Sequence, residues 1–213
     1  MTEIYIVRHC ESLTNRTATF AGVLDVDITA KGRQQLDCLS EFFKDIKLDE
    51  VVSSPLIRTK KTAEAVNKYS GAPVILDKRI IEMNVGSLEG KPVTDMDDEQ
   101  ARCWNTAPHL FSTDAECMDD VYLRVTEAFS EIVERNNNKT VAIATHGGVV
   151  RNIMRFVKGY APEGLKEIDW GDNAGVYHIL YSDGKYMIDY ESRTDFLPDD
   201  LLGDAVSDWV KPI

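Results

Sequence analysis

The chain has 213 residues, of which 43% are hydrophobic and 28% charged, and a formal net charge of −12. This composition is typical of a globular protein with a substantial core. The negative charge argues against nucleic acid or an anionic membrane as a partner, because no Lys/Arg cluster could bind a phosphate backbone. An anionic substrate would therefore need a local positive pocket.

The cysteines and the first residues of the chain predict a cytoplasmic protein. No two cysteines form a C-x-x-C pair or show the spacing of zinc ligands, so we expect free thiols in a reducing compartment. They are Cys10, Cys38, Cys103 and Cys117. The opening MTEIYIV lacks the cationic start and long apolar run of a signal peptide, and no apolar stretch approaches the roughly 20 residues that span a bilayer.

Strand and helix patterns alternate along most of the chain. In chain order, the apolar spacing predicts a strand at 4–7, a helix at 29–44, a strand at 50–54, a helix at 55–69, a strand at 73–76, a helix from about 121 to 136, a strand at 140–145 and a helix at 146–158. Thr29 and Ser54 are the expected N-caps of the first two helices, and Pro55 suits a first helical turn. The run Asn136-Asn137-Asn138 is expected to end the long helix.

The remaining segments are a polar region, a hairpin and a tail. Residues 78–117 are irregular and acidic, with one helix expected around 95–104. VYHILY and KYMIDYES flank Ser182-Asp183-Gly184, which is a hairpin signal. An acidic tail follows from about residue 194, and Trp209 could pack it against the body.

This alternation predicts the α/β class, with a mostly parallel central sheet between helices on both faces, a three-layer sandwich. We expect one domain over residues 1–213, with 88–120 as a short insertion near the active site. A homodimer is left open.

Two of the four histidines directly follow predicted strands. In open α/β sheets, ligands bind beyond the carboxyl ends of the strands, and His9 and His146 stand there. A histidine in this position can also merely cap a strand end. The other two, His109 and His178, have no such context and are expected to be structural.

Two arginines and an asparagine could bind an anion beside these histidines. Arg8 precedes His9, and Arg58 lies in the first turns of the helix after Ser54-Pro55. A planar guanidinium suits phosphate oxygens, and a helix N-terminus adds oriented N–H groups. Asn15 could donate an amide N–H to the same anion. Taken alone, Arg58 could instead be a surface residue and Asn15 a turn residue.

Five segments resemble, in order, the signature motifs of the histidine phosphatase superfamily, the phosphoglycerate-mutase-like enzymes. They are RHCES(x2)N at 8–15, GVLDVDITAKGRQQ at 22–35, SSPLIRTKKTAE at 53–64, RIIEMNVGSLEG at 79–90 and ATHGGVVR at 144–151. AECMDDVYLRV at 115–125 is a weaker match. The chain departs from the family pattern at Cys10, where glycine is usual, and at Ser12, where threonine is commoner.

The resemblance implies a role for each of these residues. His9 would attack phosphorus and form a phosphohistidine, and Glu82 would protonate the leaving oxygen and then activate water. A free glutamate has a pKa of roughly 4.3, so this role requires an upward shift. The phosphoryl oxygens would be held by the side chains of Arg8, Arg58, His146 and Asn15. Main-chain groups of Ala21, Gly22 and Gly147 would complete the site.

Residues 10–16 also match the motif of a different phosphatase loop, Cys-x5-Arg, with Cys10 as nucleophile and Arg16 as the phosphate ligand. Such a loop usually contains glycine, because successive N–H groups must converge on one anion. ESLTN has none, and Glu11 would raise the thiol pKa. We therefore prefer His9 as the nucleophile and expect Cys10 to be a small buried residue.

The sequence thus predicts a metal-independent phosphoric-monoester hydrolase of a small phosphorylated metabolite, with no cofactor. No Asp/His cluster has the spacing of metal ligands. The alternatives are a phosphomutase of the same family and a non-catalytic protein that binds a phosphorylated ligand. In residues 91–117 only Lys91 and Arg102 are cationic, which disfavours a mutase and a substrate with a second strongly anionic group.

Overall fold

The computed structural model describes residues 1–203 of the chain. Six strands form one sheet in the order β3-β2-β4-β1-β5-β6. They are β1 (Thr2–Arg8), β2 (Glu50–Ser53), β3 (Val74–Leu76), β4 (Thr140–Thr145), β5 (Val176–Ser182) and β6 (Lys185–Arg193). The first four strands in this order run parallel, and β5 and β6 extend the sheet by antiparallel pairing. The predicted mostly parallel sheet is confirmed.

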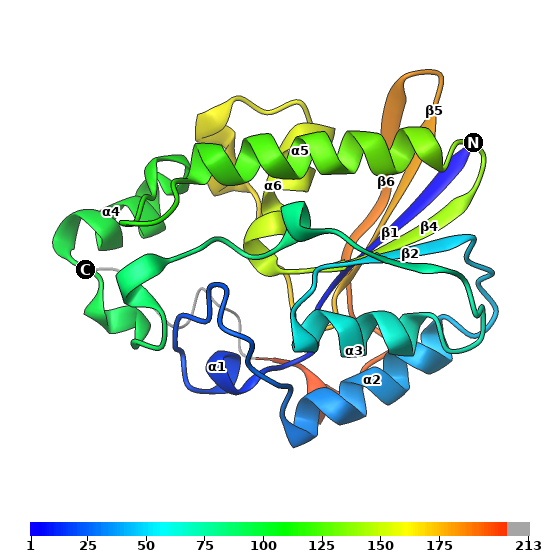
Figure 1. Ribbon diagram of the computed structural model, residues 1–213, viewed down its shortest axis with the longest axis horizontal. Coiled ribbons are helices and arrows are strands. Elements are labelled where there is room, and N and C mark those ends of the chain that lie inside the picture. The colour runs from blue at the N-terminus through cyan, green and yellow to red at the C-terminus, as the bar shows by residue number, and fades with distance from the viewer. Residues whose placement is uncertain (204–213) are drawn as a thin grey trace.

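Helices cover both faces of the sheet (Figure 1). α2 (Ala30–Phe42) and α3 (Ile57–Val66) lie on one face, and α5 (Met118–Arg135) and α6 (Gly147–Val157) lie on the other. The predicted three layers are confirmed. Two shorter helices, α1 (Leu13–Arg16) and α4 (Asp98–Thr106), lie near one end of the sheet. Short 3₁₀ helices occur at Lys78–Ile80, Gly86–Leu88, Val93–Asp95, Pro108–Leu110, Pro162–Glu167 and Asp199–Leu201.

The core divides into two halves because strand side chains alternate between the faces. Ile4 and Ile6 of β1 belong to the hydrophobic cluster under α5 and α6. Tyr5 and Val7 belong to the cluster under α2 and α3. This period of two explains why a central strand buried on both faces is a continuous apolar run in the sequence.

Of the helix ends predicted from the sequence, two are confirmed and one is wrong. Thr29 caps α2 as predicted, since its side chain accepts a hydrogen bond from Gly32 N at 3.0 Å. The long helix ends at Arg135, with Asn136 as its C-cap, as predicted. The predicted cap Ser54 is wrong: α3 begins at Ile57, after Leu56, which makes no side-chain cap bond. The Ser54 hydroxyl instead bonds to a histidine in the site.

The segment after β6 packs beside α2. Leu197 and Leu201 are buried in the cluster under α2 and α3, and the Leu201 carbonyl accepts a hydrogen bond from Gln35 Nε2 at 2.8 Å. Trp209, the expected packing residue of the tail, lies outside the described residues. Across residues 1–203, no helix combines the length and apolar character needed to cross a membrane.

Candidate active site

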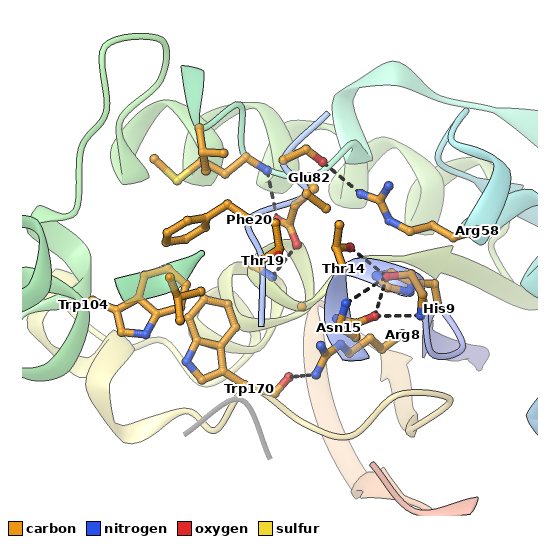
Figure 2. Close-up of a pocket in the computed structure, with 18 of the residues that line it drawn as sticks. Arg8, His9, Thr14, Asn15, Thr19, Phe20, Arg58, Glu82, Trp104 and Trp170 are labelled. Carbon is orange, nitrogen blue, oxygen red and sulfur yellow. Dashed lines mark hydrogen bonds between the residues drawn. The ribbon is translucent and has the colours of Figure 1, made fainter. Parts of the chain in front are cut away.

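A cavity of about 90 Å³ opens at the carboxyl ends of β1 and β4. Every predicted site residue except His146 lines it, and His146 lies directly behind His9, with the two ring centroids 5.3 Å apart. Figure 2 shows Arg8, His9 and Arg58 on one side and the rings of Phe20, Trp104 and Trp170 on the other, with Glu82 between them. The cavity therefore has a cationic side and an aromatic side.

His9 is held rigidly where β1 ends. Its amide donates to Thr145 O at 2.9 Å, and its carbonyl accepts from Asn173 Nδ2 at 3.0 Å. Its Nδ1 lies 2.8 Å from Cys10 O. A carbonyl oxygen can only accept a hydrogen bond, so Nδ1 carries the proton. In a neutral ring, the lone pair is then on Nε2.

Burial keeps both site histidines neutral. It is the main cause that lowers the pKa of His9 well below its usual 6.5, and the cations Arg58 and Arg8 add to the effect. The pKa of His146 is lowered in the same way, by burial and then by Arg58. Because a neutral imidazole has a free lone pair, His9 is a competent nucleophile at neutral pH.

His146 joins two parts of the site. It is the N-cap of α6, and its Nε2 lies 2.7 Å from Ser54 Oγ at the end of β2. Its Nδ1 is buried and has no hydrogen-bond partner within residues 1–203. The next residue, Gly147, lies against Arg8 and Trp170, and a Cβ there would be 3.4 Å from an atom of each. The helix N-terminus thus faces the cavity at close range, as anion sites require.

Arg58 is locked in place by the loop after α1. Its Nη1 and Nη2 donate to Leu24 O at 2.7 Å and Gly22 O at 2.9 Å. Its Nε is buried and has no partner among the described residues. Burial lowers the pKa of Arg58 to about 10, which leaves it cationic at neutral pH. A buried cation with an unused N–H is suited to a bound anion.

Arg8 and Asn15 are also held with donors to spare. Arg8 Nη1 donates to the carbonyls of Trp170 and Gly171, and its buried Nε is unpaired within residues 1–203. Asn15 Oδ1 accepts from Ser12 N at 3.0 Å, which fixes the amide plane. The two arginines therefore offer unpaired N–H groups to an anion, and the amide group of Asn15 lies beside them.

Glu82 lies next to the first turn of α6. Its Oε1 accepts from Met83 N at 2.9 Å, and its Oε2 accepts from Gly148 N at 3.2 Å. A Cβ at Gly148 would lie only 2.5 Å from Glu82 Oε1. Glycine is therefore required at residue 148 for the carboxylate to approach the helix end.

An ion pair between Arg124 and Glu116, which was not predicted from the sequence, holds the segment that carries Glu82. Arg124 of α5 donates to Arg79 O and Ile81 O, each at 2.7 Å, and to Glu82 O at 3.2 Å. Its Nε also forms an ion pair with Glu116 Oε1 at 2.6 Å. Both residues lie in the weakest motif match, 115–125, which was the available signal.

Four aromatic side chains on the side of the cavity opposite the arginines were also not predicted from the sequence. Phe20, Trp104, Phe111 and Trp170 line it together. Trp104 stacks on Trp170, with ring centroids 4.7 Å apart, and meets Phe20 and Phe111 edge-on at 5.5 and 5.2 Å. Trp104 lies in the polar, acidic segment, and the sequence contained no sign of its partners.

The structure contradicts the alternative built on Cys10. Cys10 is fully buried outside the cavity lining, and Arg16 is exposed. Burial raises the pKa of the Cys10 thiol, and its amide donates to Thr62 Oγ1 at 3.2 Å. No cradle for a thiolate and phosphate forms around this residue. In the part of the chain described, no three His, Cys, Asp or Glu residues cluster as metal ligands.

Comparison with known proteins agrees with this geometry. Residues 4–192 match the model of the histidine phosphatase superfamily (branch 1). A putative phosphoserine phosphatase 2 from Hydrogenobacter thermophilus is 32% identical over 91% of this chain and 96% of its own length. A probable phosphoglycerate mutase GpmB from Escherichia fergusonii is 34% identical over 75% of this chain and 76% of its own.

Solved structures show the same fold. YhfR from Bacillus stearothermophilus superposes with a TM-score of 0.87 at 29% identity, over 92% of this chain and 99% of its own. The α-ribazole phosphatase of Shigella flexneri has a TM-score of 0.81 at 21% identity, over 90% and 96% of the two chains. The chain therefore belongs to the histidine phosphatase superfamily and is a phosphatase.

Proposed function

We propose that the chain hydrolyses small phosphomonoesters through a phosphohistidine on His9, without a metal ion. The observation that carries this proposal is the state of His9: neutral, with the proton on Nδ1 and Nε2 left free, beside two buried guanidinium groups. A positioned nucleophile and fixed positive charge are what phosphoryl transfer requires.

In the first step, His9 Nε2 forms a bond to phosphorus while the bond from phosphorus to the leaving oxygen breaks. Arg8 and Arg58 stabilise the charge on the phosphoryl oxygens, with Asn15 and the main chain near Ala21, Gly22 and Gly147 as further donors. The role of His146 as a phosphoryl ligand stays a prediction, because its ring lies outside the cavity lining. Glu82, at the side of the cavity between the cations and the aromatic rings, gives its proton to the leaving oxygen.

In the second step, water attacks the phosphohistidine from the side that the leaving group has vacated. Glu82, now ionised, accepts a proton from this water as the new oxygen–phosphorus bond forms. The bond between Nε2 and phosphorus breaks, inorganic phosphate leaves, and His9 returns to its neutral state. Both steps use the same two side chains, so no further proton carrier is needed.

The test is to trap the intermediate. The enzyme is mixed briefly with p-nitrophenyl phosphate carrying labelled phosphorus and is then denatured. The label should be on His9, labile in acid and stable in base, and it should be absent from His9→Ala. Cys10→Ser should still be labelled, because Cys10 lies outside the cavity. A label on Cys10, or a labelled His9→Ala protein, would falsify the assignment.

A phosphomutase is the second candidate, because one relative with 34% identity carries that name. A mutase must keep water from its phosphohistidine while it holds a second anionic group, and this needs additional cations. Lys91 and Arg102 are both exposed and do not line the cavity. Incubation with 3-phosphoglycerate and catalytic 2,3-bisphosphoglycerate should therefore give no detectable 2-phosphoglycerate. Rapid interconversion without phosphate release would support the mutase instead.

We also propose that the protein works in the cytoplasm. All four cysteines are free thiols, as expected in a reducing compartment. Microscopy of a fluorescent fusion or fractionation of cells that express the chain would test this.

A further inference from the structure

We infer that the enzyme selects phosphate esters of apolar alcohols and phenols, and discriminates against leaving groups that carry a carboxylate. This inference rests on the proposed function and adds the substrate class. It comes from the side of the cavity that faces away from His9.

The charged side chains of the cavity all have tasks in phosphoryl transfer. Among the described residues, the lining contains only two cations, Arg8 and Arg58, and both lie at the phosphate end. The single acidic side chain, Glu82, is committed to proton transfer with the leaving oxygen and offers a second negative charge no attraction. No cation is left to pair with a carboxylate on the leaving group.

The surface that remains for a leaving group is apolar. It is made by Phe20, Met83, Val85, Val93, Trp104, Phe111, Met118 and Trp170. The hydroxyls near it are engaged within their own loop: Ser12 Oγ lies 3.0 Å from Thr14 Oγ1, and Thr19 Oγ1 lies 2.9 Å from Thr17 Oγ1. A carboxylate moved from water to this surface would lose its hydration and find no cation to replace it, whereas an apolar group would gain by leaving water.

The two tryptophans give this surface a fixed shape. Their rings stack at 4.7 Å, and the Arg151 guanidinium lies 4.3 Å from the centroid of the Trp170 ring. Arg151 is itself held, because its Nε and Nη2 donate to Ile168 O at 2.9 Å and Leu165 O at 2.8 Å. A rigid aromatic surface binds flat apolar groups at low entropic cost.

The aromatic surface is also close enough to act on the leaving group. Trp170 Cε3 lies 3.4 Å from the position of a Cβ on Gly147, at the N-terminus of α6, and the Trp170 carbonyl accepts from Arg8. A group esterified to a phosphate at that helix end would therefore contact Trp170 with its first few atoms.

The test uses two esters whose leaving alcohols have the same reactivity. These are n-hexyl phosphate and 6-(phosphonooxy)hexanoate, which share one chain and differ in a terminal carboxylate. The wild-type enzyme should show a kcat/KM at least tenfold higher for hexyl phosphate, because the surface offers the carboxylate no cation. A smaller ratio, or a preference for the carboxylate, would overturn the inference.

A variant ties the preference to the tryptophans. Trp104→Ala should bring the ratio of the kcat/KM values for the two esters to within threefold of unity. Trp104→Phe should keep most of the wild-type preference for hexyl phosphate. Leu110→Ala is the matched control, since Leu110 is an exposed apolar residue six positions after Trp104 in the chain and does not line the cavity. Its ratio should equal that of the wild type. A Trp104→Ala enzyme with the wild-type ratio would contradict this role.

The substrate class and the reaction can fail separately. If p-nitrophenyl phosphate leaves no label on His9, the proposed function is wrong. If the label forms but the wild-type kcat/KM for hexyl phosphate is less than ten times that for 6-(phosphonooxy)hexanoate, only the substrate class is wrong.

Discussion

At the scale of single residues, the chemistry depends on a histidine that the fold keeps neutral. His9 is 5% exposed, and its Nδ1 proton is committed to the Cys10 carbonyl. Burial and two neighbouring arginines lower its pKa. The same environment that prepares Nε2 for attack therefore opposes protonation of the ring.

This burial predicts how stability depends on pH. The pKa of His9 is lower in the folded protein than in the unfolded chain, so the unfolded chain binds a proton first as the pH falls. The contribution of His9 to the free energy of unfolding is therefore complete above pH 7.5 and decreases as the pH falls below 6.5, the usual pKa of histidine. His9→Asn removes one such group. Between pH 7.5 and 5.5, the wild-type free energy of unfolding should fall by about 1.4 kcal/mol more than that of the variant.

Urea unfolding at the two pH values measures this difference. Comparing the two proteins cancels the contribution of the shared groups whose pKa does not depend on His9. If both lost the same free energy between pH 7.5 and 5.5, His9 would not be held neutral by the fold.

At the scale of elements, Arg124 on helix α5 positions the proposed general acid and does not itself line the cavity. Arg124 bonds to three carbonyls of the segment that carries Glu82, and its partner Glu116 accepts from Asn84 N at 2.8 Å. Both side chains are largely buried. Both ends of a short irregular segment are thereby fixed to a regular helix, which limits the freedom of the carboxylate.

Arg124→Met should therefore impair proton transfer to the leaving group. We expect kcat/KM to fall about 10- to 100-fold for hexyl phosphate, because a misplaced acid loses most of its effect. For p-nitrophenyl phosphate, whose leaving group hardly needs a proton, the loss should stay below about threefold. Glu82→Gln should show the same pattern, and steady-state kinetics on both esters measures it.

The matched control for this variant lies on the same helix. Arg135 also pairs with a glutamate, Glu50, with Nη2 and Oε1 2.7 Å apart, and it does not line the cavity. Arg135→Met should leave both rates unchanged. Equal losses on the two esters in Arg124→Met would indicate a general effect on folding instead of a role in placing Glu82.

At the scale of the whole molecule, the sheet brings the two histidines together. β1 and β4 are parallel neighbours, and Arg8 is in register with Thr145. The residues that follow, His9 and His146, therefore leave the sheet at the same height. The arginines beside them create a local positive site in a chain of net charge −12, which an anionic substrate needs.

Because this positive charge comes from side chains, we expect activity without a divalent metal. Hydrolysis of p-nitrophenyl phosphate after dialysis against a chelator should stay within about 20% of the untreated rate. Added zinc or magnesium should not increase it. A loss restored by either ion would mean that Arg8 and Arg58 do not supply the charge for catalysis.

The sequence by itself determined the class of the fold and most of the cationic side of the site. Apolar runs and helical repeats indicate which segments are strands or helices, because local burial sets those periods. Once the strands at 4–7 and 140–145 are recognised, the carboxyl-end rule places His9 and His146 at one edge. The predicted general acid Glu82 came from the family resemblance, since nothing local distinguishes it from a surface carboxylate.

Only the tertiary structure decided the partners of these residues. Ser54 was predicted to cap a helix and instead bonds to His146, 92 residues away. Arg124 reaches back 42 residues to the Glu82 carbonyl, and Trp104 stacks on Trp170 from another part of the chain. A local pattern records whether a residue is buried, but a hydrogen bond or ring contact depends on which segments the fold places side by side. The leaving-group side of the cavity is built entirely from such contacts, so it could not be inferred from the sequence.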